Sequence, residues 1–284
     1  MIFLTWVSKL PLSVLYYLSD FLFFVGYRLI KYRRAVVWNS LTRSFPEKSV
    51  EELRQIEKTF YRNLCDYTVE TLKLLSISEE ELRKRMVYKN LDVLNEYVEK
   101  NQSVIYLASH QFNWEWLLAA GPFYLHPAID FVYQPQSSNF FNQFSLITRT
   151  RFGNYPIKRA QVARETVKRK EMVRGVAIVC DQFPGLDHDK RFWTKFLNQD
   201  TAFFQAINQL GVLTQYPVMF FAVRKIKRGY YEAEAKLIAV PPYSKEDTSI
   251  IENYIESTEK IIREQPEGWL WSHDRWKKPR PLGE

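Results

Sequence analysis

A chain of 284 residues, 46% apolar and 25% charged, is long enough to bury a full core, and few of its stretches look disordered. The net charge of +8 favours an anionic partner, such as a phospholipid surface, an acidic protein or nucleic acid, without choosing among them. The two cysteines form no disulfide framework, and no cysteine–histidine cluster has zinc spacing. We therefore expect neither a structural metal nor a cofactor.

The N-terminal region contains an apolar run at residues 11–30, "PLSVLYYLSDFLFFVGYRLI". Its length just suffices to cross a bilayer, although Asp20 argues against a clean span. No small-residue cleavage site follows, so a removed signal peptide fits poorly. A basic cluster follows it and would keep the next part of the chain at the cytoplasmic face: Arg28, Lys31, Arg33 and Arg34. We predict a membrane anchor over residues 1–34, spanning the bilayer or lying in its interface; a buried core helix is the alternative.

Several helices are indicated by their start signals. Ser49 with Glu52 forms a capping-box pattern ahead of a long amphipathic helix, and Ser78 with Glu81 suggests another start. Residues 159–172 have a helical apolar spacing, and Ser244 with Asp247 is expected to start the last helix.

Short apolar runs between these helices predict buried strands at residues 103–109, 128–134, 175–180 and 216–223. Residues 230–238 alternate apolar and charged side chains, which predicts a half-exposed strand at the edge of a sheet. Strands that alternate with helices indicate the α/β class. We expect residues 35–284 to form a single domain with a central mixed, largely buried sheet flanked by helices.

The stretch "LASHQFNWEW" (107–116) contains the main catalytic candidates, His110 and Glu115. On one continuous helix these two side chains would point about 140° apart. They can meet if His110 ends a strand and Glu115 lies in the first turns of a helix capped by Asn113. A carboxylate bonded to one imidazole nitrogen makes the other a better base. Such a pair could deprotonate an alcohol that attacks a thioester; the alternative is an ordinary strand-end histidine.

Three further segments carry candidate residues. Asp181 ends a buried strand in "IVCDQFPG" (178–185), either as a site residue or as a loop cap. A helix expected to begin near Thr201 could present backbone N–H groups to an anion. In "PEGWLWSHDRWKKPRP" (266–281), tryptophans alternate with basic residues such as Arg275, a pattern that suits a phospholipid headgroup plane. Single-stranded nucleic acid would also fit this pattern, but the N-terminal run favours a membrane.

These motifs, in this order, resemble the lauroyl/myristoyl acyltransferases of bacterial lipid A biosynthesis, within the wider lysophospholipid and glycerol-phosphate acyltransferases. The resemblance covers nearly the whole chain and rests on the N-terminal apolar helix together with "YRRAVVWNSLTRSFPEKS", "FYRNLCDYTVETLKLL", "SHQFNWE", "CDQFPG" and "WLWSHDRWKKPRP".

The resemblance implies acyl transfer from an acyl thioester, carried by acyl carrier protein or coenzyme A, to a hydroxyl of a lipid A precursor at the cytoplasmic face of the bacterial inner membrane. It makes His110 the general base, Glu115 its orienting partner and Asp181 a further site residue. Where the family typically has arginine after the second strand, this chain has Gln134 in "YQP". We hypothesise that Arg149 or Arg151 supplies the missing cation; Arg275 is a further substrate-binding candidate.

Two surfaces have expected roles in this reaction. The basic stretch 158–174 could dock an acidic carrier protein or anionic lipid heads, and the aromatic stretch 192–204 could form a wall of the acyl groove. Three alternatives stay open. They are an acyltransferase for another bacterial lipid, a hydrolase with Cys180 as nucleophile, and a non-catalytic membrane scaffold.

Overall fold

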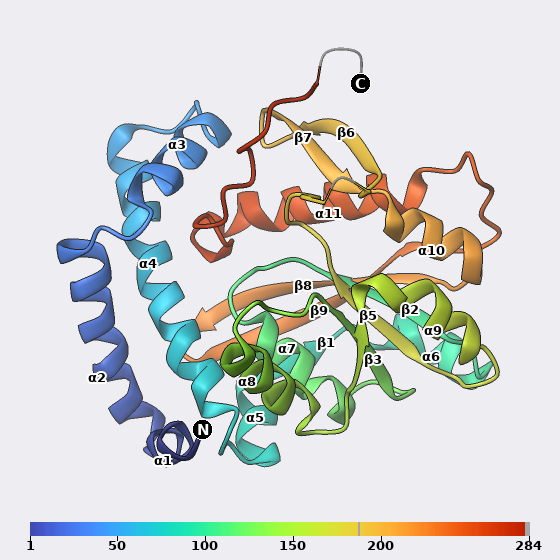
Figure 1. Cartoon of the computed structure of the whole chain (residues 1–284), viewed down its shortest axis with the longest axis horizontal. Coiled ribbons are helices and arrows are strands. Elements are labelled where there is room, and N and C mark those ends of the chain that lie inside the picture. Colours follow the sequence, from blue (N-terminus) through green and yellow to red (C-terminus); the bar gives the residue numbers. More distant parts are fainter. Residues whose placement is uncertain (187, 282–284) are drawn as a thin grey trace.

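The computed structural model describes residues 1–186 and 188–281, and a seven-stranded sheet with helices on both faces lies at its centre (Figure 1). Neighbouring strands are parallel except for the antiparallel pair β8 and β9. The order across the sheet is β1 (Met86–Lys89), β9 (Tyr230–Ala239), β8 (Val218–Lys227), β2 (Val104–Ala108), β5 (Gly175–Val179), β3 (Ile129–Tyr133) and β4 (Tyr155–Lys158). The predicted α/β fold with a mixed, buried sheet is confirmed.

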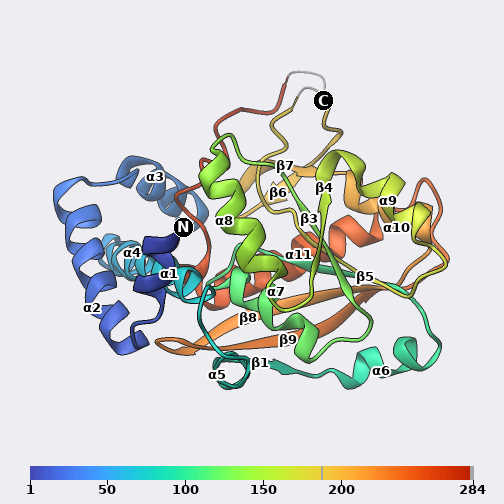
Figure 2. The same ribbon diagram turned by 60° about the horizontal axis from the view of Figure 1, so that its bottom comes forward.

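The two faces of the sheet have separate apolar cores, because successive side chains of a strand point to opposite sides. Ile105 and Leu107 of β2 belong to one core, and Tyr106 and Ala108 to the other. The first core includes residues of α9 (Val162–Lys168), α10 (Ala206–Thr214) and α11 (Ser249–Glu264); the second includes residues of α5 (Glu79–Arg85), α6 (Asp92–Glu99) and α7 (Trp114–Ala120). A hairpin of β6 (Arg191–Phe196) and β7 (Gln199–Phe204) lies over α11, and α8 (Asn139–Thr150) lies beside α7 (Figures 1 and 2).

Most helix starts follow the sequence signals. Ser49 caps α4 (Val50–Lys73) with its hydroxyl, while the Glu52 carboxylate accepts a hydrogen bond from the Ser49 N–H at 2.8 Å, so the capping box is confirmed. Ser78 caps α5. The last helix begins at Ser249, five positions after the expected Ser244, and the stretch 159–172 forms only the short helices η3 (Arg159–Gln161) and α9.

Two predictions at strands are wrong. The 230–238 strand, β9, is not an edge, because the four-residue β1 pairs with it in parallel from Tyr231 to Glu234. The alternation of apolar and charged side chains arises because one face of β9 is solvated, although both of its sides are paired with other strands. The helix expected near Thr201 is instead β7, where Thr201 pairs with Thr194, because β-branched and aromatic residues favour a strand there.

The N-terminal segment forms α1 (Ile2–Ser8), α2 (Leu12–Phe23), the π-helical turn η1 (Phe24–Leu29) and α3 (Arg34–Ser44). By length and composition alone, residues 12–29 could cross a membrane. Helix α2 lies beside α4 (Figure 1), and three hydroxyls bind acidic side chains of α4: Tyr16 to Glu70 at 2.8 Å, Ser19 to Asp66 at 2.7 Å and Tyr27 to Glu57 at 3.2 Å. The remaining short helices are η2 (Gly121–Phe123) and η4 (Pro266–Gly268).

Candidate active site

A cavity of about 580 Å³ lies at the carboxyl ends of the central strands. The register of β3 with β5 runs from Ile129 to Phe131, whereas β5 stays paired with β2 as far as Val179. Strands β3 and β5 thus separate near their carboxyl ends. Parallel α/β sheets place their ligand sites at such positions. Side chains of both apolar cores reach the opening, so the cavity is lined from both faces of the sheet; examples are Leu117, Ile129 and Phe221 on one side and Ile178, Ile207 and Leu210 on the other.

His110 lines this cavity, two residues after the end of β2, and is bonded to Asp181. Its Nδ1 is 2.6 Å from Asp181 Oδ1, and its backbone N–H donates to Asp181 Oδ2 at 2.9 Å. The indole Nε1–H of Trp269 also donates to Oδ2, at 2.6 Å. Burial raises the pKa of Asp181, but the charge of His110 and these hydrogen bonds outweigh it and bring the pKa to about 2. Asp181 is therefore a carboxylate at neutral pH.

The Asp181 contact sets the tautomer of the imidazole. A carboxylate can only accept at Nδ1, so Nδ1 carries the proton and Nε2 presents a lone pair. The Gln182 amide nitrogen lies 3.4 Å from this Nε2, and both residues line the cavity. The Nε2 side of the imidazole thus lies at the cavity, beside the Gln182 amide.

Glu115, the expected partner of His110, is bonded to Arg149 instead. The guanidinium binds both carboxylate oxygens, with Nε at 2.8 Å and Nη2 at 2.5 Å. Burial raises the pKa of Glu115, but Arg149 and His110 outweigh it and lower the pKa. Asn113 caps α7 as predicted and places Glu115 in the first turn of that helix. From there the carboxylate reaches Arg149 of α8, whose guanidinium is always charged. Among the described residues, the carboxylate that is hydrogen-bonded to the His110 ring is that of the distant Asp181.

The predicted substrate-binding residues are distributed unevenly. Gln134 and Arg149 line the cavity, and Gln134 Oε1 accepts a hydrogen bond from Arg159 Nε at 3.0 Å. Arg151 is not part of the lining, and its Nη1 donates to the Leu74 carbonyl at 2.5 Å. Arg275 is 1% exposed, does not line the cavity, and donates to the Ala202 carbonyl.

The first two tryptophans of the C-terminal motif are packed inside the protein, whereas its basic end, residues 277–281, is exposed. Trp269 and Trp271 are 3% and 0% exposed, and their indoles lie edge to face with centroids 4.7 Å apart. Their expected role at a lipid headgroup plane is therefore wrong. The expected acyl-groove wall at 192–204 is confined to Phe204, whereas Phe192 faces another groove.

Cys180 lines the cavity but is 5% exposed, and burial raises the pKa of its thiol. A thiol that stays protonated at neutral pH is a poor nucleophile, which argues against the hydrolase alternative. Within the ranges that the structure describes, no group of three histidine, cysteine, aspartate or glutamate side chains could hold a metal ion.

Three site residues were not identified from the sequence. Gln182 follows Asp181 in the same motif, and Arg159 belonged to the basic stretch, where nothing distinguished it from its neighbours. Trp269 was assigned to a lipid surface because a tryptophan among cations gives the same pattern whether it is inside or outside.

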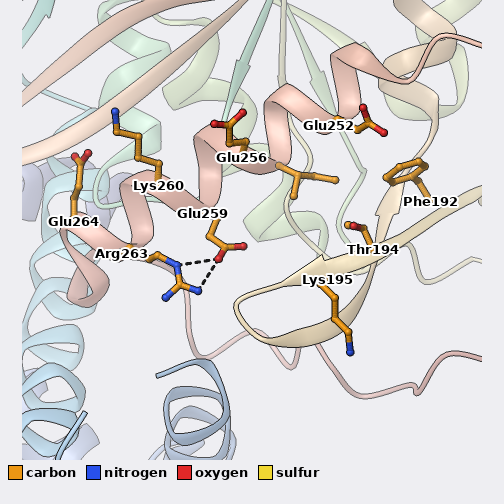
Figure 3. Close-up of a pocket in the computed structure, with 10 residues that line it drawn as sticks. Phe192, Thr194, Lys195, Glu252, Glu256, Glu259, Lys260, Arg263 and Glu264 are labelled. Carbon is orange, nitrogen blue, oxygen red and sulfur yellow. Dashed lines mark hydrogen bonds and ion pairs between the residues drawn. The ribbon is translucent and has the colours of Figure 1, made fainter. Parts of the chain in front are cut away.

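A second groove lies between β6 and α11 and shares no lining residue with the His110 cavity (Figure 3). Its walls are mainly charged side chains of α11, including Glu259 and Arg263, which form an ion pair at 2.6 Å. It contains no histidine or cysteine, so the chemistry of the site belongs to the first cavity.

Residues 1–278 match the protein family described as bacterial lipid A biosynthesis acyltransferase. No curated protein matches the chain.

Proposed function

The chain belongs to the bacterial lipid A biosynthesis acyltransferase family, and on that premise we propose that it moves a fatty acyl chain from an acyl thioester to a hydroxyl of a lipid A precursor, with His110 as general base. The observation that carries the proposal is the His110–Asp181 contact of 2.6 Å, with the opposite ring nitrogen facing an apolar cavity. Asp181 takes the role first expected of Glu115, because it holds the ring in the tautomer that the reaction needs.

The reaction needs no protein nucleophile. As the acceptor oxygen attacks the thioester carbonyl, its proton passes to His110 Nε2 and a tetrahedral oxyanion forms. Collapse of this intermediate breaks the carbon–sulfur bond, and the imidazolium returns the proton to the leaving thiolate. The Gln182 amide, 3.4 Å from Nε2, lies within reach of the developing oxyanion and is our candidate donor to it.

The cavity suits the acyl chain of the donor. Its walls are mainly aliphatic and aromatic. Each methylene group of a hydrocarbon chain buried there would contribute about 0.8 kcal/mol to binding, because it is removed from water. Arg149 and Arg159 lie among the lining residues and would face the anionic groups of the substrates. Because Gln134 binds Arg159, Arg159 is a better source of the missing cation than Arg151.

The thioester carrier would approach from the side of α9. Four cations of the basic stretch are exposed there, namely Lys158, Arg164, Lys168 and Lys170, whereas Arg169 binds Asp130 at 2.6 Å. An acidic carrier protein is therefore the donor that we favour over coenzyme A, and the rate with that donor should fall as salt is raised.

Residues 1–34 would bind the enzyme to the membrane, with residues 35–284 as the catalytic domain on the cytoplasmic side. Large apolar side chains of α1 and α2 are exposed, among them Ile2, Phe3, Trp6, Tyr17 and Phe21. The opposite side of α2 binds α4 through Tyr16 and Ser19. A helix fixed along a charged neighbour in this way fits the plane of the interface better than a span.

The catalytic proposal is tested with purified protein in detergent, a labelled acyl carrier protein thioester and a lipid extract from a Gram-negative bacterium. Products are separated by thin-layer chromatography and identified by mass spectrometry. Wild type should label a lipid A precursor, and His110→Gln should lose this transfer by roughly 10²- to 10⁴-fold. The matched control is His126→Gln, an exposed histidine outside the cavity. Equal rates in His110→Gln and wild type would refute the proposal; a labelled product of another class would show that the acceptor is a different lipid.

The membrane proposal is tested by flotation with vesicles that contain anionic phospholipid. Phe21→Glu with Phe24→Glu should abolish flotation, whereas Leu213→Glu with Ile226→Glu, equally exposed apolar residues elsewhere, should leave it intact. To separate the two orientations, cysteines replace Lys9 and Lys31 in a variant without the native cysteines. Both should react with an impermeant maleimide from the same side of inverted membrane vesicles; reaction of Lys31→Cys alone would indicate a span.

A further inference from the structure

The C-terminal segment 268–271 lies against the loop that carries His110. The Leu270 N–H donates to the His110 carbonyl at 3.1 Å, and the Phe112 N–H donates to the Gly268 carbonyl at 2.7 Å. Between these two bonds, Gln111 and Trp269 form an isolated antiparallel bridge. Gly268 has no room for a side chain, since a Cβ there would lie 2.5 Å from the Phe112 ring. The backbone after β2 is thus fixed by a segment that follows the last long helix.

Trp269 adds a direct contact with the reactive pair. Asp181 Oδ2 receives the indole N–H of Trp269 at 2.6 Å and the backbone N–H of His110 at 2.9 Å, and Oδ1 is directed at His110 Nδ1. The indole is 3% exposed and packs between Phe196 and Trp271, so its donor has a fixed direction. These two hydrogen bonds oppose rotation of the carboxylate away from the imidazole, and the indole N–H is the one that a side chain provides.

We propose that Trp269 is a positioning residue for acyl transfer, whose indole N–H holds the Asp181 carboxylate in the orientation that keeps His110 in its reactive tautomer. This inference rests on the proposed role of His110. Trp269 does not line the cavity, so it acts through Asp181.

The titratable and charged groups around the pair come from several elements. Those that face Asp181 are His110 after β2, Cys180 at the end of β5, Tyr254 of α11, and His273 and Arg275 of the C-terminal segment; Glu115 of α7 faces His110. Trp269→Phe changes none of these groups and removes the indole N–H from Asp181. Without that donor the carboxylate holds a proton more tightly, so the His110–Asp181 pair should titrate at higher pH.

Trp271 provides a matched control. It is also buried, belongs to the same segment, and donates its indole N–H at 2.6 Å, but to the Pro266 carbonyl. Trp269→Phe and Trp271→Phe therefore remove the same ring volume and the same kind of donor from positions two residues apart. Only the first change touches Asp181.

The experiment compares pH profiles of kcat and kcat/KM in the acyl-transfer assay for wild type, the two phenylalanine variants and His110→Gln. For Trp269→Phe we expect kcat to fall roughly tenfold with KM little changed, and the midpoint of the acid limb of kcat/KM to rise by about one pH unit. Trp271→Phe should keep the wild-type midpoint. If both variants share that midpoint and lose kcat equally, Trp269 is structural only and the inference fails, while loss of transfer in His110→Gln still supports the base.

A measurement that keeps Trp269 in place covers the case in which Trp269→Phe does not fold. The chain has eight tryptophans, whose indole N–H groups are resolved after ¹⁵N labelling. After Trp114→Phe has identified the signal of Trp114, which stacks edge to face on His110, another indole signal should titrate with the same midpoint as the imidazole. The absence of any such signal would overturn the inference.

Discussion

Asp181 and Glu115 are two buried carboxylates beside the same cavity, and they differ in what holds them. Asp181 is bound by an imidazole and an indole, whereas Glu115 is bound by a guanidinium at both oxygens. The pKa of each is lowered, so both are ionised at neutral pH. Only the imidazole can exchange a proton in this pH range, because a guanidinium stays charged. The His110–Asp181 pair is therefore suited to proton transfer, whereas the Arg149–Glu115 pair keeps its charges unchanged.

This difference shows that spacing along the chain does not choose a partner. The motif brings Glu115 within five residues of His110, yet the acid that binds the ring is 71 residues away. The contrast between the two acids predicts a catalytic effect at one and a structural effect at the other.

The largest effect is expected at the proton-transfer pair. Asp181→Asn keeps the shape but can donate rather than accept at His110 Nδ1, which favours the wrong tautomer. We expect kcat for acyl transfer to fall roughly 10²- to 10⁴-fold, with the free energy of unfolding little changed by comparison. A loss of only a few-fold in kcat would contradict the role of Asp181 in setting the tautomer of His110.

The second effect concerns stability. Glu115→Gln leaves Arg149, whose side chain is 22% exposed, without its counter-ion, and we expect thermal unfolding in detergent to show a loss of about 3 kcal/mol. Glu115→Gln with Arg149→Met removes both charges and should restore most of this loss. If the single variant is as stable as wild type but inactive, Glu115 belongs to the reacting groups after all.

A smaller effect depends on pH and arises at His273, next to the proton-transfer pair. Burial and Arg275 lower its pKa from 6.5 to about 4. As the pH falls, His273 is protonated in the unfolded chain before it is protonated in the folded protein. Its contribution to the free energy of unfolding is therefore fully present above about pH 6.5 and is lost as the pH falls towards 4. Its Nε2 accepts the Phe183 N–H, which the amide oxygen of a glutamine could also do. Denaturant unfolding of His273→Gln should be less dependent on pH in this window; an unchanged slope would contradict the assignment.

The smallest effect is expected at a polar pair in the cavity lining, Arg159 and Gln134. Arg159→Gln removes a cation bound to Gln134 and to Asp189, and we expect KM for the acceptor to rise about threefold while kcat stays the same. Arg164→Gln, an exposed neighbour outside the lining, is the control. Equal changes in the two variants would indicate a general effect of surface charge.

The sequence was sufficient where local chemistry decides the structure. Apolar runs located β2, β3, β5 and β8, and capping residues located α4, α5 and α7, because a cap or a buried strand is determined within a few residues. It was insufficient where distant segments meet. Residues 86–89 are too short to reveal β1, which covers the side of β9 that looked like an edge. The partners of His110 and Glu115 could not be predicted for the same reason, since each depends on which strand ends and helices the fold brings together.

The position of Trp269 also has a consequence for the order of synthesis. The chain leaves the ribosome N-terminus first, so the apolar helices of residues 2–29 are available to a lipid surface before any catalytic residue exists. Trp269, the indole donor to Asp181, is synthesised 88 residues after it. At ordinary rates of translation this interval is roughly five to twenty seconds. In a nascent chain of this design the apolar N-terminal helices are made first, and the hydrogen bonds around Asp181 are completed last.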